Sequence, residues 1–464
     1  MHKDRIKEWI HQYGHEHKQY VLYWMQQSQR VEYNHALNYA IESANFLGLP
    51  VVVCFNLTDG YLGANRRHYQ FMLEGLKEVE EKLTSMGIGF ILRIGNPINN
   101  IFNLCKNAAK LIMDRGYLKN QLKWRKDLIH MIWQQKLSLD VVEIESDVVI
   151  PVLNAYPKEA YGAYAIRRSL MQKLSTYLDY DGLKAVDHRN DLNIKSDANL
   201  KNIDFILNHL QIDQSIQSYH QYQGGYHQAL EHLDYFLNHY LIQYDKRSDP
   251  SLGIQSYLSM YLHFGQISVQ EIIRKVQQWL QTNETHRELY DGFIEQLVVR
   301  RELAFNYVVY NEGYDQYETM TEAWALKSLE LHQEDQREWV YTKTDIEQSQ
   351  THDIYFNAAM DEMRITGFMA NYMRMYWAKK IMEWSLNMKS AYETIIELNN
   401  KYFIDGRDAN SYANIAWCFG KHDKPWVERK IFGKVRYMAA SGLEKKFDID
   451  AYVNKINKLK AKEA

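Results

Sequence analysis

The feature of this chain that most constrains its fold is a change of hydrophobic pattern along its length. Up to about residue 150, short apolar runs typical of buried strands alternate with segments of helical spacing. From about residue 226 onward, apolar residues recur every three or four positions and strand signals nearly vanish. Together these patterns predict a parallel α/β domain followed by an all-α domain.

The first part of the chain is expected to form a Rossmann-like α/β domain. Its apolar runs predict strands at residues 20–25, 50–55, 89–94, 111–114 and 141–150, and its helical spacing predicts helices at residues 33–46, 66–83 and 118–135. This alternation indicates a parallel sheet with helices on both faces. Neither GxGxxG nor a GxxxxGKS/T string occurs, so we expect a sheet without the usual dinucleotide or P-loop phosphate site.

A polar stretch at residues 187–204, rich in Asn, Asp and Lys, separates the two patterns. A length of 464 residues also exceeds what one ordinary core accommodates. We therefore expect an α/β domain at residues 1–186, a connector at 187–225 and a helical domain at 226–464. The clearest helices of the last domain are expected at residues 267–280, 291–310, 353–366 and 371–385.

Composition excludes several classes of protein. The formal net charge is −3, so contact with nucleic acid requires a local basic patch. The chain has no run of 18 apolar residues, so we expect no membrane span. Cys54, Cys105 and Cys418 are too few and too scattered for a disulfide framework or a thiolate metal site. We expect a monomeric, cytoplasmic protein with reduced thiols.

The N-terminal stretch, residues 1–18, is polar and has no apolar segment resembling a signal peptide. It contains His11, His15 and His17, a group that could bind a metal. At a polar terminus we interpret these histidines as solvated surface and expect no metal site.

Four segments of the second half form a specific set. They are SYLSMYLHFGQIS at residues 256–268, FIEQLVVRREL at 293–303, NYMRMYWAKKIMEW at 371–384, and a fourth that runs from LNNKY at 398–402 through DGRD at 405–408 to FGKVRYM at 432–438. In this order they resemble the class II cyclobutane-pyrimidine-dimer photolyases of the photolyase/cryptochrome superfamily. YWM at 23–25 and SQRV at 28–31 resemble the opening of that family, so the resemblance covers nearly the whole chain.

The resemblance implies that the helical domain binds FAD and uses light to repair thymine dimers flipped out of DNA. It places Asn399 near flavin N5 and Arg374 near the ring, where a cation stabilises the anionic reduced flavin. It also implies that the N-terminal domain can hold a second chromophore, a deazaflavin or a folate. The residues that match the family's flavin site are Tyr244, Ser256, Leu258, Ser259, Leu262, Arg374, Asn399, Asp405 and Asp408.

Some of these matches also have a simpler explanation. Ser256 and Ser259 match a pyrophosphate cradle before a helix expected to begin near Ser259, but Ser is also a common N-cap. Asp405 and Asp408 match the flavin pocket, but Asp next to Gly is typical of turns.

Family members reduce their flavin through three tryptophans. Trp377 matches the flavin-proximal member and Trp384 the distal one, and a spacing of seven places them about 10.5 Å apart along one helix face. Two core aromatics at helical spacing are the simpler explanation. Phe356 stands at the middle position, and its neighbour Tyr355 points about 100° away on a helix. Because Phe is far harder to oxidise than Trp, we expect slow photoreduction.

The lesion pocket contains a second departure from the family. Gln296 aligns with a glutamate that hydrogen-bonds the dimer, whereas Glu295, one residue earlier, points about 100° away. Gln donates a hydrogen bond but no proton, so we expect weaker or slower repair. Met375 and Trp417 match residues that pack against flipped bases, and Arg300 matches a position held by Trp or Arg in relatives.

Residues 421–446 form a basic segment with eight Lys or Arg against three Asp or Glu, and with aromatic residues interleaved. A solvated charged surface is the ordinary interpretation of such a run. Contact with DNA phosphates is the functional one. The residues expected to make it are Trp426, Arg429, Lys434 and Arg436.

The favoured hypothesis is light-driven repair of cyclobutane pyrimidine dimers in UV-damaged DNA. The alternative is a cryptochrome-like blue-light photoreceptor with impaired repair, which Gln296 and Phe356 motivate. Light-independent binding of intact nucleic acid is a third possibility, which the negative net charge disfavours. The catalytic residues of the favoured hypothesis are Asn399, Arg374, Gln296, Trp377 and Trp384.

Overall fold

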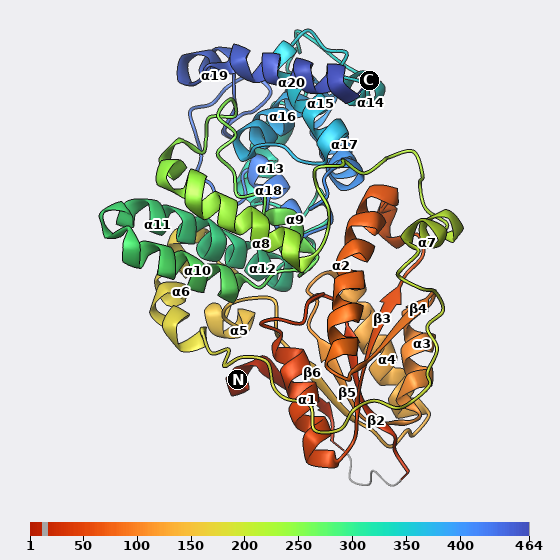
Figure 1. Ribbon diagram of the computed structural model, residues 1–464. Coiled ribbons are helices and arrows are strands. Elements are labelled where there is room, and N and C mark those ends of the chain that lie inside the picture. Colours follow the sequence, from red (N-terminus) through yellow and green to blue (C-terminus); the bar gives the residue numbers. More distant parts are fainter. Residues whose placement is uncertain (12–16, 464) are drawn as a thin grey trace.

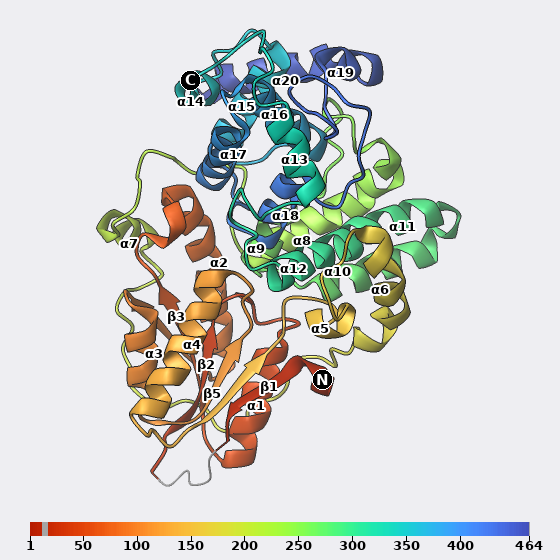
Figure 2. The same ribbon diagram turned by 180° about the vertical axis from the view of Figure 1, so that it is seen from behind.

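The computed structural model describes residues 1–11 and 17–463, and it contains an α/β part and a helical part (Figures 1 and 2). The sheet has six strands in the order β1-β6-β5-β2-β3-β4. All neighbouring pairs are parallel except β1 with β6. The predicted α/β plus all-α fold is therefore confirmed. The strands are β1 (Ile6–Ile10), β2 (Tyr20–Met25), β3 (Val51–Leu57), β4 (Gly89–Ile94), β5 (Ala108–Asp114) and β6 (Asp140–Ile144).

Helices cover both faces of the sheet because successive strand residues point to opposite sides. Val21 and Val53 pack with α1 (His35–Leu47) and α2 (Arg66–Ser85) on one face. Leu22 and Cys54 pack with α3 (Pro97–Cys105) and α4 (Lys119–Gln134) on the other. Every residue of β2 and β3 is buried, which explains why both strands are unbroken apolar runs in the sequence.

The N-terminal stretch contains a strand that the sequence did not predict. His11 and His17 are exposed, as expected. Ile6–Ile10 forms β1, an edge strand that pairs antiparallel with β6. Residues 12–16, which include His15, lie outside the described residues. His11 Nδ1 lies 3.6 Å from a carboxylate oxygen of Asp140. In the described part, no three His, Cys, Asp or Glu side chains come together in a group that could hold a metal.

The strand predicted at residues 141–150 ends earlier, at Ile144. The buried Arg5 guanidinium donates hydrogen bonds to the carbonyl oxygens of Glu145, Val148 and Val149, so these carbonyls are satisfied outside the sheet. Residues 145–150 thus leave the sheet and lead toward the helical part.

The connector at residues 187–225 covers the open edge of the sheet. Ser196 Oγ accepts from the backbone N–H of Leu92 at 3.0 Å, and Asp197 accepts from that of Ile94 at 2.9 Å. The side chains thereby satisfy N–H groups of β4 that would otherwise be open to strand pairing. The same segment contains the short helix α7 (Ile203–His209).

The proposed boundary at residue 186 remains a prediction. Helices α5 (Val152–Ala155) and α6 (Ala163–Tyr177) precede it, yet Ile166 and Leu170 share a core with Leu233 and Val298 of the helical part. The second core of the helical part surrounds α15 to α18.

The predicted helix at residues 291–310 contains a π-helical turn, η6, between two α-helices. The remaining elements are as follows: η1 (Lys3–Arg5), η2 (Tyr61–Gly63), α8 (Tyr226–Tyr235), η3 (Phe236–Tyr240), η4 (Leu241–Lys246), α9 (Ser259–His263), α10 (Val269–Thr282), η5 (Glu284–His286), α11 (Arg287–Ile294), η6 (Glu295–Arg300), α12 (Arg301–Tyr310), α13 (Ala323–Leu331), α14 (Lys343–Glu347), α15 (Ile354–Thr366), α16 (Asn371–Trp384), α17 (Met388–Tyr402), α18 (Ala409–Cys418), α19 (Ala440–Lys446) and α20 (Ile449–Glu463).

Candidate functional site

A cavity of ≈ 510 Å³ lies among the helices of the C-terminal part, and we call it the main cavity. Its walls come from the α9, η6, α16, α17 and α18 segments, which are distant in sequence. Trp384 and the basic-segment residues Trp426, Arg429, Lys434 and Arg436 are not part of its wall. The predicted residues that line it are Tyr244, Ser256, Leu258, Ser259, Leu262, Gln296, Arg300, Arg374, Met375, Trp377, Asn399, Asp405, Asp408 and Trp417.

The Ser256–Ser259 segment lines the main cavity at the start of α9, which begins at Ser259 as expected. Leu258 occupies the N-cap position, and its side chain makes no capping hydrogen bond. The simpler explanation of the two serines as N-caps of α9 is therefore not what the structure shows. Tyr257 adopts a left-handed conformation with φ of 55°, which turns the chain at this wall.

The guanidinium of Arg374 places a positive charge at a fixed position in the wall of the main cavity. Its two terminal nitrogens donate to the carboxylate of Asp405 at 2.9 and 3.1 Å, and its Nε donates to the carbonyl of Met369 at 2.9 Å. The guanidinium also lies 3.9 Å from the ring centroid of Phe403. Paired hydrogen bonds and an aromatic face orient a guanidinium strongly, so the cation has a defined position in the cavity.

Asn399 lies one turn before the end of α17 and is 6% exposed. Its Nδ2 donates to Oδ1 of Asn400 at 3.0 Å. A carboxamide has a second N–H and a carbonyl oxygen. Asn399 thus keeps both a donor and an acceptor for a ligand in the main cavity.

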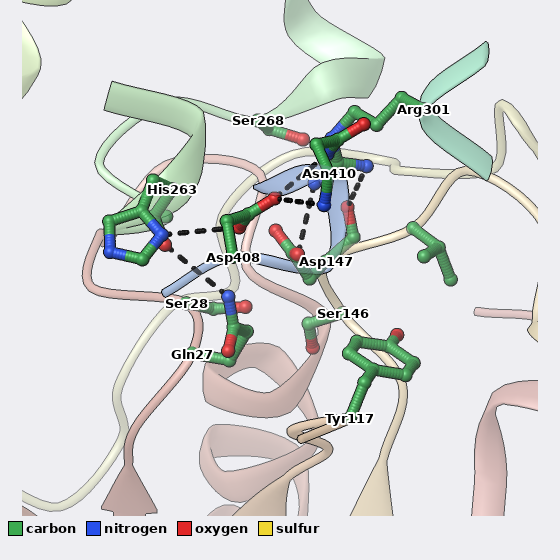
Figure 3. Close-up of polar contacts among 12 residues, drawn as sticks. Gln27, Ser28, Tyr117, Ser146, Asp147, His263, Ser268, Arg301, Asp408 and Asn410 are labelled. Carbon is green, nitrogen blue, oxygen red and sulfur yellow. Dashed lines mark hydrogen bonds and ion pairs between the residues drawn. The ribbon is translucent and has the colours of Figure 1, made fainter. Parts of the chain in front are cut away.

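Asp408 both lines the main cavity and caps α18. Its Oδ1 accepts from the backbone N–H and from Nδ2 of Asn410, each at 2.8 Å, and its Oδ2 lies 3.1 Å from His263 Nδ1 (Figure 3). Burial alone raises the pKa of this carboxyl, but the hydrogen bond from His263 and those from Asn410 outweigh it and hold the pKa below its ordinary value. Asp408 therefore caps a helix and lines the cavity at the same time.

Polar contacts join the α/β part to the helical part near His263 and Asp408 (Figure 3). Arg301 donates to the Asp147 carboxylate at 2.9 Å and to its carbonyl oxygen at 3.3 Å. Gln27 Nε2 donates to the carbonyl oxygen of His263 at 3.4 Å. Both members of the Arg301–Asp147 ion pair are buried, so this contact fixes the relative position of the two parts locally.

Glu295 and Gln296, neighbours in η6, have different surroundings. Glu295 accepts from Arg167 at 2.8 and 2.9 Å and from Arg300 at 3.1 Å. Burial alone raises the pKa of Glu295, but these two guanidinium groups lower it overall. Gln296 lines the main cavity instead. The expectation that Glu295 does not replace Gln296 agrees with this geometry, although the π turn was not anticipated.

The aromatic residues of the expected relay lie along α15 and α16. Trp377 lines the main cavity and its Nε1 donates to Met360 Sδ at 3.3 Å. Trp384 is only 2% exposed, so it is not itself a surface group. Phe356 lies edge-on to Trp384, whereas the Tyr355 hydroxyl donates to Glu444 at 3.2 Å, away from the relay.

Beyond Trp384 the aromatic residues continue to the surface. The ring of Tyr341 lies 5.4 Å from that of Trp384, and Trp339 stacks 6.4 Å from Tyr341. Trp339 is 45% exposed.

The basic segment contacts the wall of the main cavity through Arg436. The Arg436 guanidinium lies 5.3 Å from the ring centroid of Trp417, which lines the cavity, and 4.2 Å from that of Trp426. Trp426, Arg429 and Lys434 are exposed. Lys421 differs, because it is buried and paired with Glu159 and Glu322.

Known proteins share both the sequence and the fold of this chain. Residues 21–178 match the DNA photolyase family model. A deoxyribodipyrimidine photo-lyase of Methanothermobacter thermautotrophicus is 39% identical over 443 residues, which cover 95% of each chain. The chain belongs to the DNA photolyase family. It is therefore an enzyme of the photo-lyase class.

Solved photolyase-type structures share the fold. A bacterial class III photolyase from Agrobacterium tumefaciens superposes with a TM-score of 0.72 at 18% identity, over 95% of this chain and 86% of that one. A cryptochrome from Synechocystis superposes with a TM-score of 0.70 at 16% identity, over 94% of this chain and 88% of that one.

This photolyase chain has a second cavity that the sequence did not reveal, and we call it the small cavity, ≈ 130 Å³ in volume. It opens at the carboxyl ends of β2 and β3, where ligands bind in parallel α/β sheets. His263 and Asp408 line both cavities. Other residues of its wall include Gln27, Tyr61, His68, Trp124, Phe264 and Arg407.

His263 and Arg407 are the clearest residues that motif matching had not assigned to a site. Both lie inside strings that carried the resemblance, LHFGQIS and DGRD. Their placement in a wall depends on contacts between distant segments, which a string cannot show. No helix in the described part of this photolyase is long and apolar enough to cross a bilayer.

Proposed function

We propose that this chain repairs cyclobutane pyrimidine dimers in UV-damaged DNA by light, as a class II member of the photolyase family. The observation that carries the proposal is the composition of the main cavity wall. Residues matched to the flavin site, Arg374 and Asn399, and residues matched to the lesion site, Gln296 and Trp417, line one continuous space. A bound cofactor and a flipped-out dimer would meet there.

The main cavity fits FAD in size and in chemistry. Its ≈ 510 Å³ lies within the range of cofactor pockets. Ser256 and Ser259 supply hydroxyl donors for phosphates, and Arg374 supplies a cation for the ring system. When bound there in its reduced form, FAD supplies the light-excited electron that splits the dimer.

The chain's own residues orient the reactants. Arg374, fixed by Asp405, favours negative charge on the ring beside it. The free donor and acceptor of Asn399 match a ring nitrogen in either protonation state. Met375 and Trp417 offer an apolar and an aromatic surface for the flipped bases, and the Gln296 amide donates to a base carbonyl.

The basic segment would bind the DNA backbone around the flipped lesion. Trp426, Arg429 and Lys434 are exposed, and the Arg436 guanidinium lies over the rings of both Trp426 and Trp417, which lines the cavity. Phosphate contacts position the duplex without reading its sequence. The enzyme would act on DNA as a cytoplasmic monomer.

The small cavity is the best candidate for the ring of a second chromophore, a deazaflavin or a folate, because its ≈ 130 Å³ holds part of such a molecule rather than the whole. Tyr61 and Trp124, whose ring centroids lie 5.6 Å apart, offer aromatic walls for a planar ring. Its position at the ends of parallel strands matches the usual ligand crevice of α/β sheets.

The alternative is a cryptochrome-like blue-light photoreceptor with impaired repair. Two observations favour it: Gln296 in the cavity cannot supply a proton, and Phe356 interrupts the aromatic relay. A photoreceptor of this kind would bind FAD yet show no preference for damaged DNA.

DNA binding in the dark distinguishes the two functions. FAD-loaded protein is titrated with a duplex that contains one thymine dimer and with the same duplex undamaged, at several salt concentrations. Repair predicts tighter binding to the damaged duplex, with affinity that falls as salt rises. Equal affinity for the two duplexes would favour the photoreceptor.

A further inference from the structure

The end of α17, which carries Asn399, is held by residues from two other segments. The last carbonyl groups of a helix have no partner within the helix. Here Asn65 Nδ2 donates to the carbonyl of Lys401 at 2.6 Å, Arg67 donates to that of Tyr402 at 3.1 Å, and His68 Nε2 lies 3.0 Å from that of Phe403. These donors come from the start of α2, in the α/β part of the chain.

Arg407 completes this set of donors. Its Nη1 donates to the carbonyl oxygen of Asn400, and its backbone N–H donates to Asn400 Oδ1 at 2.9 Å. Asn399 Nδ2 donates to the same Oδ1 at 3.0 Å. Asn400 thus joins Arg407 directly to the carboxamide expected to face flavin N5.

The side chain of Arg407 is 3% exposed and lines the small cavity, whereas Asn399 lines the main cavity. Burial lowers the pKa of the Arg407 guanidinium to about 10, so it stays charged at neutral pH. Among the described residues, its Nη2 has no hydrogen-bond partner. A buried donor left unpaired is costly, so an acceptor oxygen that reached this nitrogen from the small cavity would be stabilised.

The backbone of Arg407 adds to the tight positioning of this residue. Its φ of 60° lies in the left-handed region, which costs free energy for a residue with a side chain. The hydrogen bonds to Asn400 hold that conformation in place. A shift of the guanidinium toward a ligand would therefore act on Asn400 through two contacts at once.

We propose that Arg407 is a positioning residue that couples occupancy of the small cavity to the Asn399 carboxamide, and through it to the redox equilibrium of bound FAD. The inference rests on the proposed function, since it takes the main cavity as the FAD site. The ligand it requires is a planar aromatic molecule with a carbonyl or anionic oxygen. The aromatic walls accept the ring. Arg407 Nη2 is buried and unpaired, so the guanidinium shifts toward the cavity to donate to the oxygen.

The test uses the full-length, FAD-loaded protein and 8-hydroxy-5-deazariboflavin as the probe, with a folate, methenyltetrahydrofolate, as the second probe. Binding is followed by probe fluorescence, and bound FAD is titrated with reductant with and without the probe. Arg407→Met removes the donors while keeping most of the side-chain length. Arg67→Met is the matched control, because Arg67 is also buried and also caps the end of α17 but does not line the small cavity.

In wild type, one of the two probes is expected to bind and to change the FAD reduction equilibrium about fivefold or more. Arg407→Met should bind that probe roughly tenfold more weakly, because it loses a charged hydrogen bond. It should also abolish the response of FAD, which Arg67→Met should retain. A wild-type response in Arg407→Met, or binding of neither probe to wild type, would overturn the inference.

Two separate measurements keep this result apart from the proposed function. FAD content and dimer repair are determined on the same samples without the probe. Absent FAD or absent repair in wild type would count against the proposed function. If FAD content and repair are normal but the bound probe does not change the FAD reduction equilibrium, only the proposed role of Arg407 is contradicted.

Discussion

The ring of Phe356 lies edge-on to the indole of Trp384, with their centroids 5.0 Å apart at an interplanar angle of 73°. Both side chains are buried. The position expected for the middle member of the relay is therefore in contact with its distal member, but it is occupied by a ring that is hard to oxidise. Replacement of this one side chain should restore electron transfer along α15 and α16.

Phe356→Trp and Phe356→Tyr should both speed the reduction of bound FAD under blue light, because each introduces an oxidisable ring next to Trp384. We expect a gain of at least about tenfold, which corresponds to about 1.4 kcal/mol in the barrier. Transient absorption of the FAD-loaded protein measures the rate.

The site of Phe356 is fully buried, so a larger ring costs about 1–3 kcal/mol of stability through overpacking. Phe356→Tyr adds only a hydroxyl and keeps the test meaningful if the Trp variant is unstable. Phe356→Leu is the matched control and should bring no gain. An unchanged rate in both oxidisable variants would show that the relay does not pass through this position.

Gln296→Glu should raise the rate of dimer repair at equal illumination. Gln296 lines the main cavity, and a carboxyl there can donate a proton as well as a hydrogen bond. We expect an increase of roughly tenfold in the repair rate, about 1.4 kcal/mol. The measurement is repair of a dimer-containing oligonucleotide by chemically reduced protein.

Glu295→Gln is the control for that substitution. It changes a neighbouring carboxylate that pairs with Arg167 and Arg300, so repair should stay near the wild-type rate. If Glu295→Gln lowered repair as much as Gln296→Glu raised it, the assignment of the lesion contact to Gln296 would be wrong.

The double variant Arg429→Ala/Lys434→Ala should weaken DNA binding about equally for damaged and undamaged duplexes. Both side chains are exposed in the basic segment. Loss of two phosphate contacts should reduce the slope of log affinity against log salt by about 2. Lys458→Ala, an exposed lysine on α20, is the control and should leave the slope unchanged. An unchanged slope in the double variant would place the DNA elsewhere.

Lys379 should make the stability of the protein depend on pH in the alkaline range. Its Nζ is fully buried and donates to the carbonyl of Cys418, and burial lowers its pKa to about 8 from 10.5. Between these values the unfolded chain binds the proton and the folded chain does not, so stability rises with pH. The shift corresponds to about 3 kcal/mol.

Denaturation of wild type and of Lys379→Met at several pH values measures this contribution. Relative to the variant, wild type should gain stability as the pH rises from about 8 to 10.5. A constant difference between the two proteins over that range would contradict a buried, pKa-shifted amine at this position.

The fold was largely predictable because its signals are local. β2 and β3 are buried along their whole length and are apolar runs in the sequence, and α2 and α10 carry clear helical spacing. β1 was missed because Ile6–Ile10 is an edge strand that includes charged residues, and its pairing with β6 joins distant segments. Charged edge strands are common, since they discourage pairing with other chains.

Part of the main cavity wall was predictable because Ser256, Gln296, Arg374 and Asn399 lie in the matched strings, whereas their roles toward FAD and the lesion stay predictions. The small cavity was not predictable, because its wall gathers single residues from segments around Met25, Tyr61, Trp124 and Arg407. No local pattern marks such a set. The π turn η6 was also missed, because a helix that widens for one turn keeps its apolar spacing.

Repair by chemically reduced, FAD-loaded protein under anaerobic conditions tests the central claim most directly. Dimer-containing oligonucleotide is added, blue light is applied, and recovery of thymine absorbance is followed against a dark control. Chemical reduction bypasses Phe356, so the result depends on the main cavity alone. The account predicts recovery in the light and none in the dark. No recovery in the light, with FAD bound and dark binding to the damaged duplex demonstrated, would contradict it.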